Sequence, residues 1–271
     1  MDKNLYRSTL LFFIVCVSLM FHSAPVFSQK SINELRMTSA VLIVKDLKVS
    51  AGWYRKFLQF SIEEYRPNQH VKMRNDEFQL TLRQGNGTLL QSQIRFKEGK
   101  KHINGIEKIG FKTNRFDSLH LYLERYEQPF AQDIFADQNL DILSFVAEDP
   151  DGNKIRFFDA PNNSQLYEID PCYFTIQSSD YINTLKWYTT QMGFEEIEIV
   201  DDTNLHFQNY LTKDGIILEL IHLPYESVET TEFMPLERDL AQIEQVTFKI
   251  GTAKTKAFVM DNNGNKVVYL K

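Results

Sequence analysis

The chain contains two tryptophans, and both lie in the same repeated context. One segment reads Trp53-Tyr-Arg-Lys-Phe-Leu-Gln-Phe60 and the other reads Trp187-Tyr-Thr-Thr-Gln-Met-Gly-Phe194. A second pair of segments follows in the same order, as Asp149-Pro-Asp-Gly-Asn-Lys-Ile-Arg-Phe-Phe158 and Asp261-Asn-Asn-Gly-Asn-Lys-Val-Val-Tyr-Leu270. Two markers that recur in one order indicate an internal duplication, so the fold must use one structural unit in tandem.

Each tryptophan segment is predicted to be a helix between two strands. The flanking runs, 40–44 with 61–65 and 173–176 with 195–200, are rich in β-branched and aromatic residues. Apolar residues recur along each helix at spacings of three and four, and Asp46 precedes the first helix at a capping position. The first apolar stripe consists of Val49, Trp53, Tyr54, Phe57 and Leu58, and the second of Ile182, Leu185, Tyr188 and Met192. Both stripes should pack on a sheet.

The second marker of each copy predicts a β-hairpin, because Asp-Gly and Asn-Gly favour positive φ at both central positions of a tight turn. The two tryptophans are 134 residues apart, whereas Gly152 and Gly264 are 112 apart, so the second copy is 22 residues shorter. The loss falls after strand 244–250, whose counterpart 107–113 leads into a predicted helix at 117–126. The short segment that follows, 251–256, cannot hold a crossover helix, so the last strands should form a plain hairpin.

Residues 1–28 have the pattern of a secretory signal peptide. A short basic segment precedes an apolar run from Leu10 to Phe21, and a small residue follows at Ser28. A membrane anchor is the alternative, but the run is shorter than the roughly 20 apolar residues that span a bilayer. We therefore expect cleavage near Ser28, no stable membrane span after cleavage, and a periplasmic or extracellular location.

The rest of the composition excludes several classes of function. A formal net charge of −6, without a stretch rich in Lys and Arg, argues against nucleic acid as a partner. Cys172 is the one cysteine beyond the N-terminal segment, so neither an intrachain disulfide nor a cysteine-based zinc site is expected, and this thiol should lie in the core. The sequence lacks paired histidines, a nucleophile motif and a glycine-rich phosphate loop. We therefore predict no catalytic residue.

A strand, a helix carrying Trp-Tyr, further strands and a closing Asp-Pro-Asp-Gly-Asn turn together resemble the vicinal oxygen chelate superfamily. This superfamily includes glyoxalases, bleomycin-resistance proteins and extradiol dioxygenases, and the likeness is carried mostly by residues 44–60 and 145–158. The resemblance implies an α+β fold of tandem βαβββ modules whose curled mixed sheets form a cup. It implies a first glyoxalase-like domain at 37–160 and a second, shortened one at 170–271.

Enzymes of this superfamily hold a divalent metal in the cup, with one ligand from the first and one from the last strand of each module. Carried onto this chain, the resemblance places Ser39, Gln79, Lys108 and Arg156 at these positions in the first domain, and Pro171, Glu219, Gln245 and Val268 in the second. The two basic side chains of the first set would repel a cation, and Pro171 and Val268 have no donor atom. No metal cofactor is therefore expected, and Glu219 and Gln245 are only weak metal candidates.

Three functions are compatible with these residues. The first is metal-free binding of a small ligand, including an anionic one, in the cup of the first domain. Lys108 and Arg156 would supply positive charge there and Ser39 and Gln79 hydrogen bonds, unless the two basic residues are only solvated strand ends. The second is a metal-dependent glyoxalase-like lyase or dioxygenase that uses the weak candidates of the second domain, with further ligands from elsewhere in the chain or from a dimer partner. The third is a non-catalytic scaffold or interaction protein.

Overall fold

The computed structural model describes most of the chain beyond its N-terminal segment. The described residues are 34–85, 105–160, 169–178, 180–197, 208–222, 242–250, 256–260 and 266–270. The predicted signal peptide, residues 1–28, lies outside this part of the chain. Residues 33–271 form one compact unit. Within the described ranges, no helix is both long enough and apolar enough to cross a membrane.

Three consecutive modules each consist of a strand, a helix and three further strands. The first contains β1 (Leu35–Val44), α2 (Leu47–Leu58), β2 (Ser61–Arg66), β3 (His70–Asn75) and β4 (Phe78–Gln84). The second contains β5 (Gly105–Thr113), α4 (Phe116–Arg125), β6 (Phe130–Asp137), β7 (Ile142–Glu148) and β8 (Lys154–Asp159). The third contains β9 (Ile169–Ser178), α5 (Tyr181–Thr190), β10 (Glu195–Glu196), β11 (Gln208–Lys213) and β12 (Ile216–His222). In every module the first and last strands pair in parallel.

A fourth module is shorter, with β13 (Gln242–Ile250), β14 (Lys256–Met260) and β15 (Lys266–Leu270). Strands β14 and β15 are antiparallel, so the predicted terminal hairpin is confirmed, and β15 pairs in parallel with β13. Among its described residues this module has no counterpart of α4 or β6. These two elements together span the 22 residues from Phe116 to Asp137. The lost segment therefore corresponds to a helix and the strand after it, and not to the helix alone.

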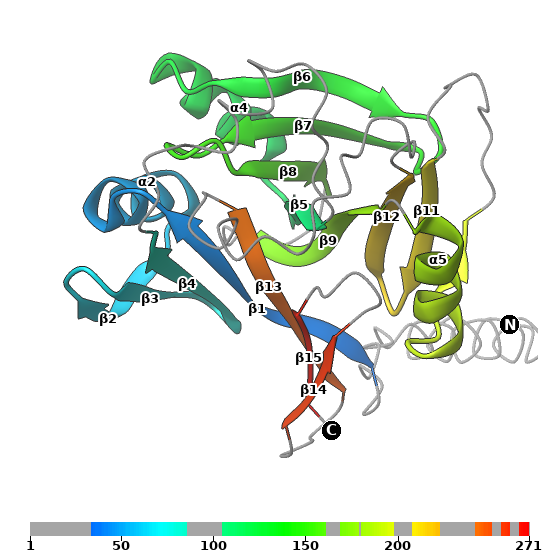
Figure 1. Cartoon of the computed structure of the whole chain (residues 1–271). Helices are drawn as coiled ribbons and strands as arrows, with labels where there is room; N and C mark the ends of the chain where they lie inside the picture. Colours follow the sequence, from blue (N-terminus) through cyan, green and yellow to red (C-terminus); the bar gives the residue numbers. More distant parts are fainter. Residues whose placement is uncertain are drawn as a thin grey trace, which may run out of the picture. The chain divides into compact units, whose positions relative to one another are not determined.

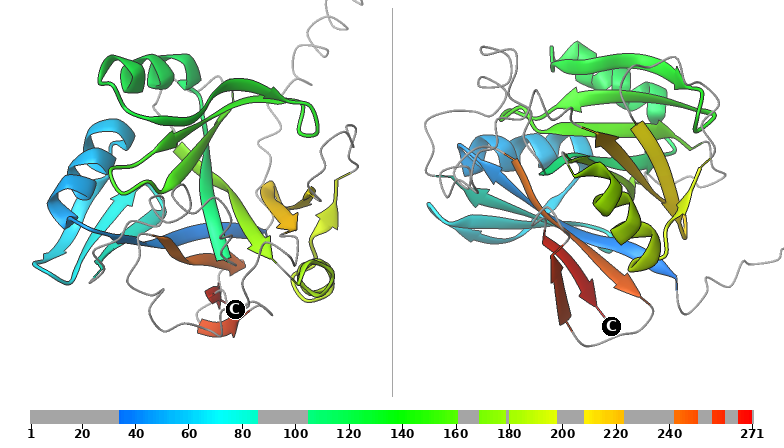
Figure 2. Two further views of the ribbon diagram at one scale, coloured as in Figure 1. Left: turned by 45° about the horizontal axis from the view of Figure 1, so that its top comes forward. Right: turned by 45° about the vertical axis from the view of Figure 1, so that its right-hand side comes forward.

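Strand pairing joins the first module to the fourth and the second to the third. Strand β1 is antiparallel to β13, and β5 is antiparallel to β9. One series of strands therefore runs β2-β3-β4-β1-β13-β15-β14, and the other runs β6-β7-β8-β5-β9-β12-β11-β10. Figure 1 shows the second series curling from β6 round to β11, and Figure 2 shows it from two further directions. The two series meet where Ile106 pairs with Ile243.

This architecture confirms the predicted α+β class of tandem modules with curled mixed sheets. The predicted limits of the two domains, 37–160 and 170–271, stay a prediction. The first strand of every module pairs with a strand from the other predicted domain. The two segments are consequently interleaved through their sheets.

The predicted helices form, and the predicted apolar stripe of each Trp-Tyr helix contains one wrong residue. Asp46 caps α2 by accepting hydrogen bonds from the backbone N–H groups of Lys48 and Val49, at 2.8 and 3.1 Å. The predicted stripes are wrong at Val49 and Ile182, whose exposed fractions are 54% and 71%. The steps of four residues from Val49 overshoot the helical repeat of 3.6, and the steps of three from Ile182 fall short of it, so the N-terminal end of each stripe lies away from the buried face.

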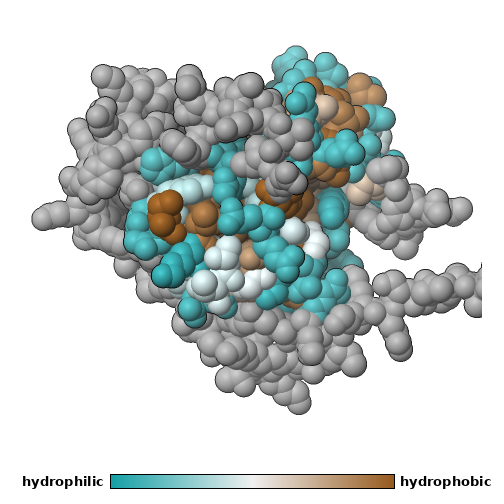
Figure 3. Space-filling view, turned by 90° about the vertical axis from the view of Figure 1, so that its right-hand side faces the viewer, coloured by the Kyte–Doolittle hydropathy of each residue, from teal (hydrophilic) through white to brown (hydrophobic). Residues whose placement is uncertain are grey.

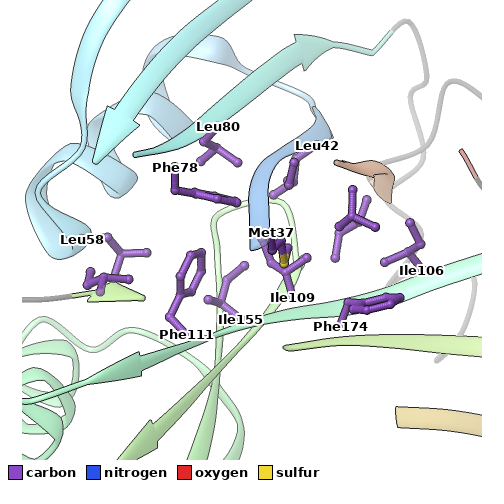
Figure 4. Packing of buried hydrophobic residues seen from close by; sticks show 14 of the residues in the cluster. Met37, Leu42, Leu58, Phe78, Leu80, Ile106, Ile109, Phe111, Ile155 and Phe174 are labelled. Atoms are coloured by element: carbon purple, nitrogen blue, oxygen red, sulfur yellow. The ribbon is translucent and has the colours of Figure 1, made fainter. Parts of the chain in front are cut away.

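The main hydrophobic core receives side chains from all four modules. Figure 4 shows Met37 of β1, Ile109 of β5 and Phe174 of β9 within this packing. Leu119 and Leu123 of α4 belong to the same cluster, so this core lies on the helix-covered face of the sheet. Cys172 is buried as predicted, and burial raises the pKa of its thiol to about 12.

The Asp-Pro-Asp-Gly-Asn turn between β7 and β8 connects the second module to the first through hydrogen bonds. Buried Asp149 accepts a hydrogen bond from the Tyr54 hydroxyl of α2 at 2.9 Å, and Asp151 accepts one from the Lys45 N–H at 2.8 Å. Burial raises the pKa of Asp149 to about 6. The hairpin prediction is confirmed, but only Gly152 of this turn has a positive φ, at 82°, so the expectation of two such residues is wrong. The tyrosine of the first Trp-Tyr motif thus holds the turn of the other sequence marker.

Figure 3 shows the face that lies at the right-hand side of Figure 1. Hydrophilic residues surround scattered hydrophobic areas there. Because these areas are not joined into one patch on the described part of this face, the surface identifies no partner. A homodimer, considered above as a source of further metal ligands, stays a prediction.

Candidate functional site

The polar site lies on the face of β5, β8, β9 and β12 that points away from the main core. Along each strand successive side chains alternate between the two faces. Phe174 and Ile176 of β9 enter the main core, and so Tyr173 and Thr175 point to the opposite face. On the neighbouring strands, Thr175 is aligned with both Lys108 of β5 and Glu219 of β12. Side chains from two different modules therefore meet on the inside of the curl.

Glu219 is the centre of this group and is only 3% exposed. Its carboxylate accepts hydrogen bonds from the Lys108 ammonium at 2.9 Å and from the Thr175 hydroxyl at 2.6 Å. The Tyr173 hydroxyl and the Gln208 amide donate to it as well. Burial alone would raise the pKa of Glu219, but the charges of Lys108 and Arg156 outweigh burial and lower it to about 2. Glu219 is therefore an ionised, fully engaged carboxylate.

Arg156 of β8 is a second buried charge and is 2% exposed. Its guanidinium donates to the Asp137 carboxylate at 2.6 Å and to the Ser144 hydroxyl at 2.9 Å, and it also donates to the Tyr173 hydroxyl at 3.3 Å. The ring of Phe158 lies 4.6 Å from the guanidinium carbon, within range of a cation–π contact. Burial opposes the charged form, but the interactions with Tyr173 and Glu219 outweigh it and raise the pKa of Arg156.

One hydrogen bond crosses the interior of the curl. The Tyr210 hydroxyl of β11 donates to the Asp137 carboxylate of β6 at 2.8 Å. In the series of strands, β6 and β11 are separated by β7, β8, β5, β9 and β12. Because their side chains still touch, the polar network closes the curled sheet from one side to the other.

A glycine makes room for this arrangement. Gly110 of β5 is aligned with Arg156 on one side and with Tyr173 on the other. A Cβ atom at Gly110 would lie 2.8 Å from the Tyr173 ring and 2.9 Å from the Arg156 carbonyl oxygen. The Tyr173 ring therefore lies across β5 only because position 110 has no side chain.

The structure divides the four residues predicted to bind a ligand into two pairs. Lys108 and Arg156 join the group around Glu219 in the series of the second and third modules. Ser39 and Gln79 are aligned with each other on β1 and β4, in the other series. The two basic side chains are not solvated strand ends, because Arg156 is buried and the Lys108 side chain is 16% exposed.

The two weak metal candidates are also separated. Glu219 lies on β12 and Gln245 on β13, with β9 and β5 between these strands in the sheet. The Gln245 amide donates to the Thr247 hydroxyl at 3.0 Å. Across the residues that the structure describes, no three side chains of His, Cys, Asp or Glu are grouped as a metal site.

Several site residues were missed at the level of sequence. Thr175 is aligned with Lys108 and Glu219, whereas Pro171, the position carried over from the resemblance, is aligned with Phe111. The alternation of Tyr173 and Thr175 with apolar neighbours was an available signal for the inward face. Asp137 and Tyr210 carried no comparable signal, since their roles depend on contacts across the curl.

The donors at these positions do not fit a divalent metal. Two of the positions are taken by an ammonium and a guanidinium, which repel a cation and have no lone pair to donate. The Glu219 carboxylate is already occupied by four donors. A metal at this site would have to displace internal cations from their own counter-ions.

Solved structures show which fold this is. Glyoxalase I from Zea mays aligns with 88% of this chain and 93% of its own, at 14% identity and a TM-score of 0.59. A Bacillus subtilis protein provisionally assigned as a dioxygenase aligns with 88% of this chain and 85% of its own, at 9% identity and a TM-score of 0.64. No family model and no curated protein matches the sequence. The chain therefore has a glyoxalase-like fold.

Proposed function

We propose that this chain is an exported, metal-free protein that binds a small ligand in the cup formed by its second and third modules. The observation that carries the proposal is the pairing of Lys108 with Glu219 at positions where enzymes of this fold hold a metal. The cup retains charged and hydrogen-bonding groups that can orient a ligand but no donor set for a metal. Ser39 and Gln79 lie in the other series and take no part in this site.

Lys108 is the group best placed to meet the ligand. Its side chain is 16% exposed, and its ammonium lies 2.9 Å from Glu219 and 3.7 Å from Glu107. An ammonium has three donors, so one more acceptor can be accommodated after these two carboxylates. A carboxylate, phosphate or carbonyl oxygen is the ligand group that fits.

Metal content tests the first part of the proposal. Elemental analysis of the purified protein, before and after incubation with Zn, Ni, Mn or Fe, is expected to find metal far below one equivalent. One equivalent that disappears in Glu219→Ala would instead support a metal-dependent lyase or dioxygenase.

Thermal shift tests the second part. Small carboxylates, phosphate monoesters and neutral carbonyl compounds are screened against the wild type, Lys108→Met and Lys112→Met. Lys112 is the matched control, because it lies on the same strand at the same alternation as Lys108. A shift that Lys112→Met keeps and Lys108→Met loses is expected. No shift with any of the three classes would favour the scaffold.

Export is tested separately. Residues 1–35 are fused to a phosphatase that is active only outside the cytoplasm. The fusion is expected to be active, and mass spectrometry is expected to find it cleaved near Ser28. Val15→Arg, which interrupts the apolar run, should abolish the activity. An active but uncleaved fusion would indicate an anchor.

A further inference from the structure

We infer that Lys108 and Arg156 serve as built-in cations that tie the curled sheet together, in the place where enzymes of this fold hold a divalent metal. This role goes beyond ligand binding, because it concerns how the cup keeps its shape when it is empty. It rests on the charges, on the strands that they connect and on the closure of the curl.

The charges correspond to those of an occupied metal site. Lys108 and Arg156 together carry two positive charges, as a divalent ion does. Glu219 and Asp137 provide the two facing carboxylates, at 2.9 Å from Lys108 and 2.6 Å from Arg156. All four groups are enclosed, with side-chain exposures from 3% to 16%. Buried charges are tolerated only when they are paired and hydrogen-bonded, and these are both.

The connections also correspond to those of a metal centre. Glu219 of β12 receives donors from β5, β9 and β11, through Lys108, Thr175 and Gln208. Arg156 of β8 reaches β6 and β7 through Asp137 and Ser144. Two charged centres thereby link seven strands of one series, including the four of this series to which the resemblance assigns ligand positions, β5, β8, β9 and β12.

The Tyr173 hydroxyl joins the two centres. It accepts a hydrogen bond from Arg156 at 3.3 Å and donates one to Glu219. The Tyr210–Asp137 hydrogen bond completes the circuit across the interior. The low local dielectric strengthens the hydrogen bonds and ion pairs of such a network as long as every polar group has a partner. Removing one member leaves a buried polar group without a partner and destabilises the fold strongly.

A double-mutant cycle tests whether the network ties the sheet. Melting temperatures are measured for the wild type, Lys108→Met, Glu219→Gln and the double variant, each with and without EDTA. Each single variant is expected to melt about 6 °C or more below the wild type, because it leaves a buried charge without its partner. The double variant should lose much less in melting temperature than the two single variants together. EDTA should leave all four melting temperatures unchanged. Additive losses, or single losses no larger than that of Lys112→Met, would overturn the inference.

A milder variant covers the case in which the charge variants do not fold. Tyr210→Phe removes only the hydroxyl that crosses the curl. It is expected to lower the melting temperature by about 2–4 °C, the shift that corresponds to one lost hydrogen bond in a unit of this size. Tyr122→Phe is the control, since Tyr122 is 38% exposed and lies outside the network. Equal melting temperatures for the two variants would count against the inference.

A variant designed to gain metal binding tests directly whether Lys108 and Arg156 take the place of a metal ion. Lys108→His with Arg156→Gln removes both internal cations and, together with Glu219, supplies three metal donors. Ni or Zn is expected to raise the melting temperature of this double variant by at least 3 °C and to leave the wild type unchanged. A wild type that is equally stabilised by metal would overturn both this inference and the metal-free function. If the ligand screen finds no shift but the double-mutant cycle shows that Lys108 and Glu219 are coupled, the proposed ligand binding is overturned and this inference stands.

Discussion

Glu219 is the residue at which the chemistry of this protein departs most clearly from that of a metal site. A carboxylate in the cup of a metal-dependent protein offers its lone pairs to the ion. In this chain the same lone pairs accept from an ammonium, two hydroxyls and an amide. The residue type is compatible with metal binding, but its neighbours have already used its capacity.

The charge of Glu219 predicts a dependence of stability on pH. The pKa in the folded protein is lowered from 4.5 to about 2. The stabilising contribution is therefore complete above pH 4.5 and is lost as the pH falls toward 2. The difference in melting temperature between the wild type and Glu219→Gln should be largest near pH 6 and should shrink below pH 4.5. Glu77→Gln, at a side chain that is 77% exposed, is the control and should show almost no difference at any pH.

Gly110 predicts a test at the level of one methyl group. Gly110→Ala should destabilise by roughly 1–3 kcal/mol, because its Cβ would overlap the Tyr173 ring and the backbone of β8. Gly52→Ala is a matched control with the opposite expected sign. No atom lies within 4 Å of a Cβ built there, and alanine stabilises a helix by about 1 kcal/mol relative to glycine. Urea denaturation measures both changes, and equal effects would contradict the proposed close approach at Gly110.

At the level of elements, each of the first three modules combines a helix with a first and a last strand that pair in parallel, and Asp46 caps the helix of the first module. The Asp-Pro-Asp-Gly-Asn turn shows how elements of different modules become dependent on one another. Asp149 serves its own turn by accepting from the backbone N–H groups of Asp151 and Asn153, and it also receives the Tyr54 hydroxyl from α2. In the first copy of the two sequence markers, the Trp-Tyr segment therefore contacts the turn directly.

The start of α2 provides a prediction at this scale. Asp46→Ala removes the acceptor for the backbone N–H groups of Lys48 and Val49 and should cost about 1 kcal/mol of the free energy of unfolding. Asp46→Asn keeps a capping oxygen and should remain close to the wild type. Chemical denaturation distinguishes the two variants. A loss of the same size in both would show that the charge of Asp46, and not its cap, is what matters.

At the scale of the whole molecule, the pairing of β1 with β13 and of β5 with β9 makes the two halves of the chain depend on each other. In residues 34–160 alone, β1 would lack its partner β13 and β5 would lack its partner β9. We expect this fragment and residues 169–271 to be unfolded when expressed separately, and to form a folded complex when expressed together. Near-ultraviolet circular dichroism and the chemical-shift dispersion of NMR spectra show whether each fragment, and the two together, are folded. A folded 34–160 fragment would instead support the two predicted domains as independent units.

The sequence by itself was sufficient for features that depend on near neighbours along the chain. The duplication, the cap at Asp46, the hairpin at Gly152 and the 22-residue loss were all readable, because turns, caps and periodicity are set by local backbone preferences. The choice of Lys108 and Arg156 as cup residues came from the resemblance to the vicinal oxygen chelate superfamily and not from a local pattern.

Only the tertiary structure decided which inward residues meet. The pairing of the second module with the third brings Lys108 to Glu219 and leaves Ser39 and Gln79 in the other series. Thr175, and not Pro171, lies beside Lys108 and Glu219, and the curl brings Asp137 to Tyr210. These contacts join segments far apart in the chain, and a shift of one residue or a different module pairing would change every one of them. The repeated Trp-Tyr segments therefore predict the modules, whereas the packing of the modules determines the site.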